Sequence, residues 1–283
     1  METALFLGFL AAALRIATPL LFAAMGEVVA ERGGVLNLGI EGAMLAGALT
    51  AALVGQSGGP AAGVVMAGVV GAVCGAIVAL VAVWARADQV ITGTAVTLGA
   101  VGLTGAVYRA TLGSGNSEQT LETLKHPWVM SVGALLSVPL IWWALYRTRW
   151  GLALRATGED RHAAAANGVR VVRMQTTALL IAGAMAGLGG ATLVLGQVGS
   201  FAEKMTAGRG FVAVAIVVLG RWHPFGVLGA ALLFGVLQAL QFLLQGMGLD
   251  LPYQLFLVLP YLLTLLALAG LVGRARAPAG LGR

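Results

Sequence analysis

Ionisable and amide side chains gather near the start of the chain, where Glu27, Glu31, Arg32, Asn37 and Glu41 lie between two apolar runs. Such groups are costly inside apolar segments, so their presence needs a reason. One interpretation is a buried hydrogen-bonded network at a helix turn. The other is the inner mouth of a pathway for a polar solute, with Glu27, Asn37 and Glu41 as the candidate lining. The network is the favoured interpretation, and the pathway stays open.

Neutral hydrogen-bonding side chains occur in other apolar runs, and Thr94, Gln197 and Gln238 represent them. Hydroxyls and amides suit an uncharged polar solute, because a bare charge in a medium of low dielectric constant would need a counter-charge. Threonine can also bond back to its own helix, and glutamine can tie two helices together. We include these three residues among the candidate pathway residues, with both interpretations open.

The residue types that carry catalysis are scattered. His126, His162 and His223 fall on three different expected loops, so they form no H-E-x-x-H pair and no metal cluster. No G-x-x-x-x-G-K-[ST] phosphate-binding loop occurs, so ATP hydrolysis by that route is excluded. The single cysteine, Cys74, lies in an apolar run and cannot form an intrachain disulfide. The sequence predicts no catalytic residue, metal or cofactor.

The composition identifies the solvent that surrounds most of the chain. Hydrophobic residues make up 59% of the 283 residues and charged residues only 10%, with a mean hydropathy of +0.93. One soluble core could not bury so much apolar surface, so lipid must cover it. The net charge of +6 comes from arginines that flank apolar runs, without an aromatic-interleaved basic stripe. Binding to nucleic acid is therefore not expected.

Apolar runs near the roughly 20 residues that a helix needs to cross a bilayer recur along the chain. They lie at about 4–26, 35–55, 61–85, 91–111, 129–146, 174–196, 209–220, 225–245 and 253–272. The sequence predicts an all-α, polytopic transmembrane helical bundle of about 8–10 membrane segments, with residues 1–283 as one domain. The run 209–220 is too short to span the bilayer, and short or broken segments often line a cavity. The first run lacks a basic flank and is expected to be a retained span.

Arginines predict the orientation, because short loops rich in Lys and Arg stay in the cytoplasm. Six arginines fall between residues 147 and 173, and alternation then places Arg32, Arg86, Arg221 and the C-terminus on the same side. The N-terminus and the polar stretch 113–126 are expected outside.

Pairs of glycines four residues apart, Gly71 with Gly75 and Gly183 with Gly187, allow the backbones of two helices to approach closely. The spacing is common in glycine-rich spans, so general packing is the favoured interpretation.

Three ordered motifs give the chain a family resemblance. They are GEVVAERGGVLNLGIEG (26–42), RATGEDRHAAAANGV (155–169) and GRGFVAVAIVVLGRWHPFG (208–226). Together they resemble the permease subunits of bacterial ABC importers, in the group of branched-chain amino acid and simple-sugar permeases. Within it, NLGIEG after an ERGG turn is most similar to the nucleoside branch. The likeness covers residues from about 20 to 270.

The resemblance implies partners and a coupling loop. Family members pair two permease subunits, here expected to be different chains, receive solute from an extracytoplasmic solute-binding protein and are driven by a cytoplasmic ABC ATPase. The loop within 147–173 corresponds to the helix that docks on the ATPase, although His162 stands where relatives often carry other residues. Acidic residues at its start and Asn167-Gly168 at its end suit a capped helix. The implied coupling residues are Arg155, Gly158, Glu159, Asp160, Ala163, Ala164, Ala165 and Gly168.

The resulting hypothesis is a permease subunit, not an enzyme, in the bacterial cytoplasmic membrane, which imports nucleosides or related polar solutes. A simple-sugar or branched-chain amino acid permease is the alternative within the family. A stand-alone secondary carrier would need carboxylates for a coupling ion in mid-span. A scaffold subunit that moves nothing would need neither a broken segment nor a coupling loop.

Overall fold

The computed structural model describes residues 2–111, 122–246, 258 and 277–282. The predicted last span, 253–272, lies outside the described residues except for Val258, and so does most of the expected outer loop at 113–126.

The described elements are all helical, which confirms the predicted all-α class. They are α1 (Glu2–Arg32), α2 (Ile40–Gly58), α3 (Pro60–Val78), η1 (Ala79–Trp84), α4 (Gln89–Thr111), α5 (Trp128–Arg147), α6 (Arg149–Glu159), α7 (Arg161–Ala166), α8 (Val171–Ala191), η2 (Thr192–Val198), α9 (Arg209–Leu219) and α10 (Pro224–Gly246). The two η elements are π-helical continuations of α3 and α8. They were not predicted, because a widened turn leaves the apolar pattern of its helix unchanged.

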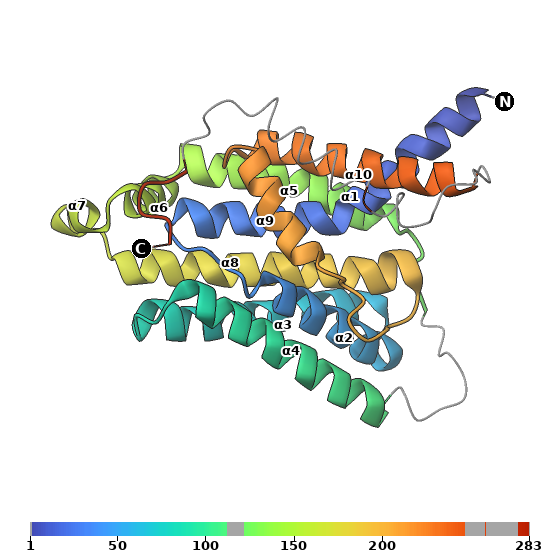
Figure 1. The fold of residues 1–283 in the computed structure, drawn as a ribbon, viewed down its shortest axis with the longest axis horizontal. Helices are drawn as coiled ribbons and strands as arrows, with labels where there is room; N and C mark the ends of the chain where they lie inside the picture. The colour runs from blue at the N-terminus through green and yellow to red at the C-terminus, as the bar shows by residue number, and fades with distance from the viewer. Residues whose placement is uncertain (1, 112–121, 247–257, 259–276, 283) are drawn as a thin grey trace.

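Six helices in the described ranges are long and apolar enough to cross a membrane, which confirms the polytopic prediction. They lie at Phe6–Arg32, Pro60–Trp84, Gln89–Thr111, Trp128–Arg147, Val171–Val198 and Pro224–Gln245. The predicted short segment corresponds to α9, which has only 11 residues. The second predicted run differs from the structure at its start: its first residues are irregular, and α2 begins at Ile40 part-way along the bundle (Figure 1).

The helix α8 lies at the centre of the bundle and packs against α1, α2 and α3. Its contact with α3 depends on glycine. A Cβ atom on Gly71 would stand 2.2 Å from the carbonyl oxygen of Gly183, and one on Gly187 would stand 2.1 Å from that of Ala67. Both distances are too short for any side chain, so the predicted four-residue glycine spacing marks a true backbone-to-backbone contact.

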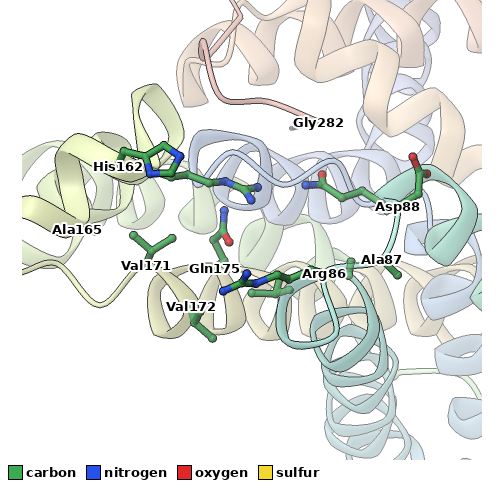
Figure 2. Close-up of a pocket in the computed structure, with 13 residues that line it drawn as sticks. Arg86, Ala87, Asp88, His162, Ala165, Val171, Val172, Gln175 and Gly282 are labelled. Atoms are coloured by element: carbon green, nitrogen blue, oxygen red, sulfur yellow. The ribbon is translucent and has the colours of Figure 1, made fainter.

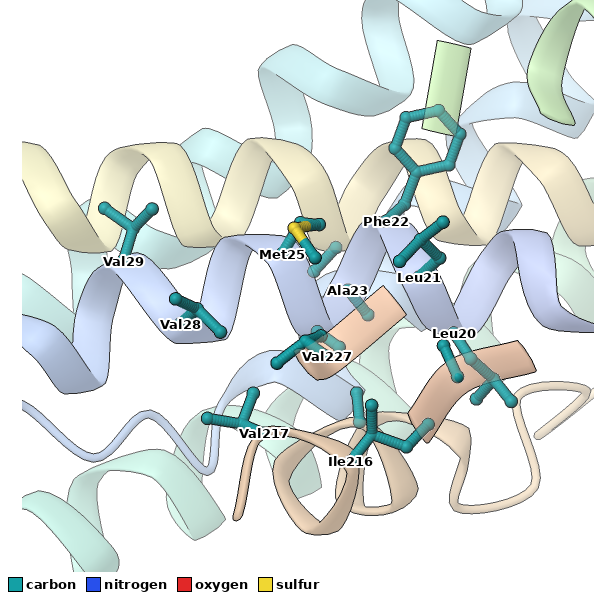
Figure 3. Packing of buried hydrophobic residues seen from close by; sticks show 14 of the residues in the cluster. Leu20, Leu21, Phe22, Ala23, Met25, Val28, Val29, Ile216, Val217 and Val227 are labelled. Carbon is teal, nitrogen blue, oxygen red and sulfur yellow. The ribbon is translucent and has the colours of Figure 1, made fainter. Parts of the chain in front are cut away.

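The short helix α9 is held by an apolar cluster on the other side of α1. Ile216 and Val217 of α9 and Val227 of α10 are fully buried against the stretch of α1 from Leu20 to Val29 (Figure 3). Because α9 makes its apolar contacts inside the bundle, a helix too short to span the membrane can still sit at membrane depth.

The two ends of the bundle differ in charge. The end of α1, the α6–α7 region and the C-terminal segment 277–282 lie at one end, and the N-terminus lies at the other (Figure 1). We call the first the basic end, because it carries Arg32, Arg86, Arg221 and the arginines of residues 147–173. The arginines that the sequence predicted to share one side of the membrane therefore lie at the same end of the bundle.

Candidate functional site

An irregular stretch, residues 33–39, runs back into the bundle between α1 and α2, and we call it the re-entrant segment (Figure 1). Non-helical backbone in a membrane protein must find hydrogen-bond partners within the protein. Three distant side chains supply them near its start. Gln175 Nε2 donates to the Gly33 carbonyl at 3.1 Å, and Arg161 donates to the Gly34 carbonyl at 3.2 Å. Gln89 Oε1 accepts from the Leu36 N–H at 2.8 Å.

The second half of the re-entrant segment uses residues of the NLGIEG motif and α1. Glu27 Oε1 accepts from the Asn37 N–H at 3.0 Å, and Asn37 Oδ1 accepts from the Gly39 N–H at 3.2 Å. Thr97 of α4 donates its hydroxyl to the Leu38 carbonyl at 3.0 Å. Glu27 and Asn37 thus act as acceptors in a buried network, which is the first of the two roles that the sequence left open.

Glu41 joins the beginnings of two helices deep in the bundle. It lies in the first turn of α2, yet its buried carboxylate caps α9. Oε1 accepts from the Thr206 hydroxyl at 2.6 Å and from the Gly208 N–H at 2.9 Å, and Oε2 accepts from the Gly210 N–H at 2.6 Å. A carboxylate suits the unpaired N–H groups and the positive dipole of a helix N-terminus. Two broken segments therefore meet at one side chain.

The third motif is fastened to the end of α1 at the basic end. Glu31 Oε2 accepts a hydrogen bond from Trp222 Nε1, and Arg32 Nε donates to the Trp222 carbonyl at 2.8 Å. Arg221 and Trp222 both adopt left-handed backbone conformations, with φ of 57° and 54°. Such conformations are strained for residues with side chains and persist where the surroundings hold them. The hydrogen bonds from Glu31 and Arg32 to Trp222 provide these surroundings, and they join two motifs that are far apart in the sequence.

The remaining candidate pathway residues do not join this network. Thr94 donates its hydroxyl to Val90 and Ile91 carbonyls of its own helix. Gln197 donates to the Arg15 carbonyl at 2.6 Å, towards the end opposite the basic end. Gln238 Oε1 in α10 is buried and has no hydrogen-bond partner among the described residues. Among the described residues, these three side chains therefore share no hydrogen bond with one another or with Glu27, Asn37 and Glu41.

The predicted coupling loop forms two short helices at the basic end. Asp160 caps α7 by accepting from the N–H groups of His162 and Ala163, at 2.8 and 3.0 Å. These bonds hold the pKa of Asp160 below its usual value, because they favour the charged carboxylate. Gly168 follows the helix with φ of 80°, in the left-handed conformation typical of a C-terminal glycine. Glu159 differs from expectation in ending α6 instead of opening α7.

The eight coupling residues divide by exposure. Glu159, Asp160, Ala163, Ala165 and Gly168 are exposed, whereas Ala164 is buried against the rest of the chain. Arg155 is half-buried and packs on α5, because its Nε donates to the Leu145 carbonyl at 3.0 Å and its guanidinium lies over the Tyr146 ring.

Gly158 also serves to pack the coupling loop against the rest of the chain. A Cβ atom there would stand 2.2 Å from the Arg32 carbonyl oxygen, so only glycine fits between α6 and the end of α1. The C-terminal segment packs on the same spot: the Gly280 N–H donates to the Gly158 carbonyl at 2.8 Å, and the Ala279 N–H donates to Glu159 at 3.4 Å. The loop is thus held from two sides.

Sequence reasoning missed Gln89, Gln175 and Arg161 as partners of the re-entrant segment. Their partners are 53, 142 and 127 residues away, so no local spacing shows the pairing. The available signal was a long polar side chain at the beginning of a helix, at Gln89 of α4 and Gln175 of α8. In the part of the chain that the structure describes, no three metal-binding side chains come together.

Several known proteins with a similar sequence are named as transport permeases. The family described as "Branched-chain amino acid transport system / permease component" matches residues 9–268. The guanosine ABC transporter permease protein NupQ of Bacillus subtilis is 35% identical, over 94% of this chain and 92% of its own. The putative glucose ABC transporter permease protein TsgC13 of Haloferax volcanii is 36% identical, over 86% and 80%. The nucleoside ABC transporter permease protein NupC of Lactococcus lactis is 30% identical, over 92% and 91%. No solved structure matches the chain.

Proposed function

The chain belongs to the family of branched-chain amino acid transport system permease components, and we propose its function from that membership. It is the membrane-spanning permease subunit of an ATP-driven importer in the bacterial cytoplasmic membrane. Its solutes are nucleosides or related small polar compounds. The observation that carries the nucleoside assignment is the 35% identity to a guanosine permease along 94% of the chain.

The broken segments support a transport role. The re-entrant segment and α9 both place helix ends within the bundle, where they meet at Glu41. In transporters, discontinuous helices at membrane depth supply the polar groups of the solute path, because a continuous helix has no free backbone groups. Glu27, Asn37 and Glu41 then shape the path by fixing its backbone, and Gln238, with its unpaired Oε1, is a candidate for direct contact.

The basic end supports coupling to a cytoplasmic ATPase. Ala163 and Ala165 are exposed on two sides of α7, and the helix is capped by Asp160 at its start and by Gly168 at its end. A small-residue surface suits a close fit into a groove of another protein. By the positive-inside rule this end faces the cytoplasm, with the N-terminus outside and the C-terminus inside. A second permease subunit, expected to be a different chain, and an extracytoplasmic solute-binding protein complete the complex.

The solute assignment is tested by uptake into proteoliposomes that contain the full complex and ATP. Labelled guanosine, adenosine and uridine should be taken up, and each unlabelled nucleoside should compete with the others. Complex without ATP is the control. Uptake of a sugar or a branched-chain amino acid, without competition by any nucleoside, would contradict the nucleoside assignment and leave the importer assignment standing.

A sugar is the second candidate solute, because the putative glucose permease TsgC13 is similar to the chain at 36% identity. The same assay with glucose as competitor separates the two. Both solutes are uncharged and rich in hydrogen-bonding groups, so the permease surface alone does not distinguish them, and selectivity resides mainly in the solute-binding protein.

A further inference from the structure

A groove lies at the basic end between α7 and the beginnings of α4 and α8. It has a volume of about 710 Å³ and is lined by residues that include Arg86, Asp88, Gln89, Arg161, His162 and Gln175. The side chain of Arg86 extends along the groove towards Gln175 and Val172 (Figure 2). The groove therefore brings together three separate parts of the chain, and its polar side chains come from all of them.

The cations in the groove are not matched by anions. Asp88 is the only acidic side chain among the described lining residues, and it caps α4 by accepting from the Ile91 N–H at 2.9 Å. Arg86 makes no ion pair within the described parts of the chain. Arg161 uses one nitrogen for the Gly34 carbonyl, while its buried Nε has no hydrogen-bond partner there. Two guanidinium groups thus retain donors for an anion.

A second hollow, of about 400 Å³, adjoins the groove and shares Val83, Arg86, Ala165, Val171 and Val172 with it. It adds Trp84, Arg170 and Arg173. Trp84 is 62% exposed, and two further apolar side chains, Leu80 of η1 and Ile91 of α4, are 63% and 69% exposed. Exposed apolar side chains on spanning helices face lipid, and tryptophan marks the depth of the headgroups. The groove is therefore next to the bilayer.

We propose that this groove binds the headgroup of an anionic phospholipid. The phosphodiester lies between Arg86 and Arg161, and an acyl chain follows Trp84 and Val172 into the bilayer. Guanidinium groups present paired donors that match phosphate oxygens, and basic pockets between spanning helices bind anionic headgroups. Free inorganic phosphate shares the chemistry of the headgroup, but it would leave the exposed apolar side chains of Trp84 and Val172 without a contact. The bound lipid bridges α4 to α7 and α8.

The test uses the purified full chain in detergent, stripped of lipid and offered equal amounts of phosphatidylglycerol and phosphatidylcholine. Native mass spectrometry counts the lipids retained. We expect phosphatidylglycerol to be retained preferentially, and Arg86→Gln to weaken its retention about fivefold, the effect of one arginine at an anionic headgroup. Arg149→Gln removes the same charge from an exposed position at the same end but outside the groove, and it should retain the lipid as the unchanged chain does.

Each other outcome overturns the proposal. Equal loss in both variants would mean diffuse charge attraction, and equal retention of the two lipids would mean no headgroup site. Displacement of phosphatidylglycerol by millimolar inorganic phosphate would assign the groove to the free ion. A second measurement needs no arginine variant: phosphatidylglycerol with brominated chains should quench the protein fluorescence more than brominated phosphatidylcholine does, and Trp84→Phe should abolish that difference. Equal quenching by the two lipids in the unchanged protein would contradict the site.

Discussion

One carboxylate, that of Glu41, fixes the beginning of α9. It satisfies two backbone N–H groups and a hydroxyl from the stretch Thr206–Gly210, far along the chain from α2. Few other acceptors could do this at membrane depth, because neither lipid nor the apolar side chains around α9 accept hydrogen bonds. We infer that Glu41 has a positioning role: it sets where α9 begins within the bundle.

Replacing Glu41 with alanine should therefore destabilise the protein. The two buried N–H groups left without a partner cost about 1–3 kcal/mol each, so we expect a loss of about 2–6 kcal/mol in the free energy of unfolding. Glu41→Gln keeps one acceptor and should lose roughly half as much. Thermal unfolding in detergent measures both. Glu203→Gln, which breaks the exposed ion pair with Arg109, is the control and should change little. A Glu41→Ala protein as stable as that control would refute the positioning role.

A bulky residue at Ala163 should uncouple transport from ATP hydrolysis. Ala163 is exposed on α7 and does not line the groove that holds Arg86 and Arg161, so Ala163→Trp leaves the fold intact but blocks a close fit to the ATPase. We expect most ATP-driven uptake in proteoliposomes to be lost, with an unchanged melting temperature. Ala61→Trp, at an exposed position at the start of α3, should preserve uptake. Ala164 is unsuitable for this test because it is 4% exposed, and a larger side chain there would disturb the protein itself.

At the scale of elements, the sequence predicts continuous helices well and interrupted ones poorly. The apolar runs predict the bounds of α3, α4, α5, α8 and α10 closely. Each of these helices forms its backbone hydrogen bonds within its own segment, so its bounds depend little on other parts of the chain. The cap of α7 by Asp160 is also local and was predictable. The depth at which α2 begins was not, because it depends on Gln89, Gln175 and Thr97, whose partners are known only once the helices are packed. Thr94, a neighbour of Thr97 along α4, bonds within its own helix, which is one of the two interpretations that the sequence left open.

The contact between α3 and α8 gives a prediction at this scale. Gly71→Ala would place a methyl group against the backbone of α8, so the helices must move apart, and we expect a loss of about 1–3 kcal/mol in the free energy of unfolding. Gly99→Ala is the matched control. No atom lies within 4 Å of a Cβ built there, so it should be neutral or stabilising by up to about 1 kcal/mol through helix propensity. Equal stability of the two variants would show that α3 and α8 do not touch at Gly71.

The orientation of the whole molecule can be tested with single cysteines in a Cys74→Ala background. Ser57 at the end of α2 and Asn167 after α7 are both exposed, at opposite ends of the bundle. Ser57→Cys should react with an impermeant thiol reagent in intact cells, whereas Asn167→Cys should react only after the cells are opened. Thr157 would be a poor reporter, because it is buried. Labelling in the reverse order would place the basic end outside.

The partners of the re-entrant segment also set an order of events during synthesis. Its carbonyls at Gly33 and Gly34 depend on Gln175 and Arg161, which the ribosome adds 142 and 127 residues later. Until then these two carbonyls lack their partners, and hydrocarbon offers no substitute. We infer that the beginning of α2 reaches its final depth in the bundle only after α8 has been translated.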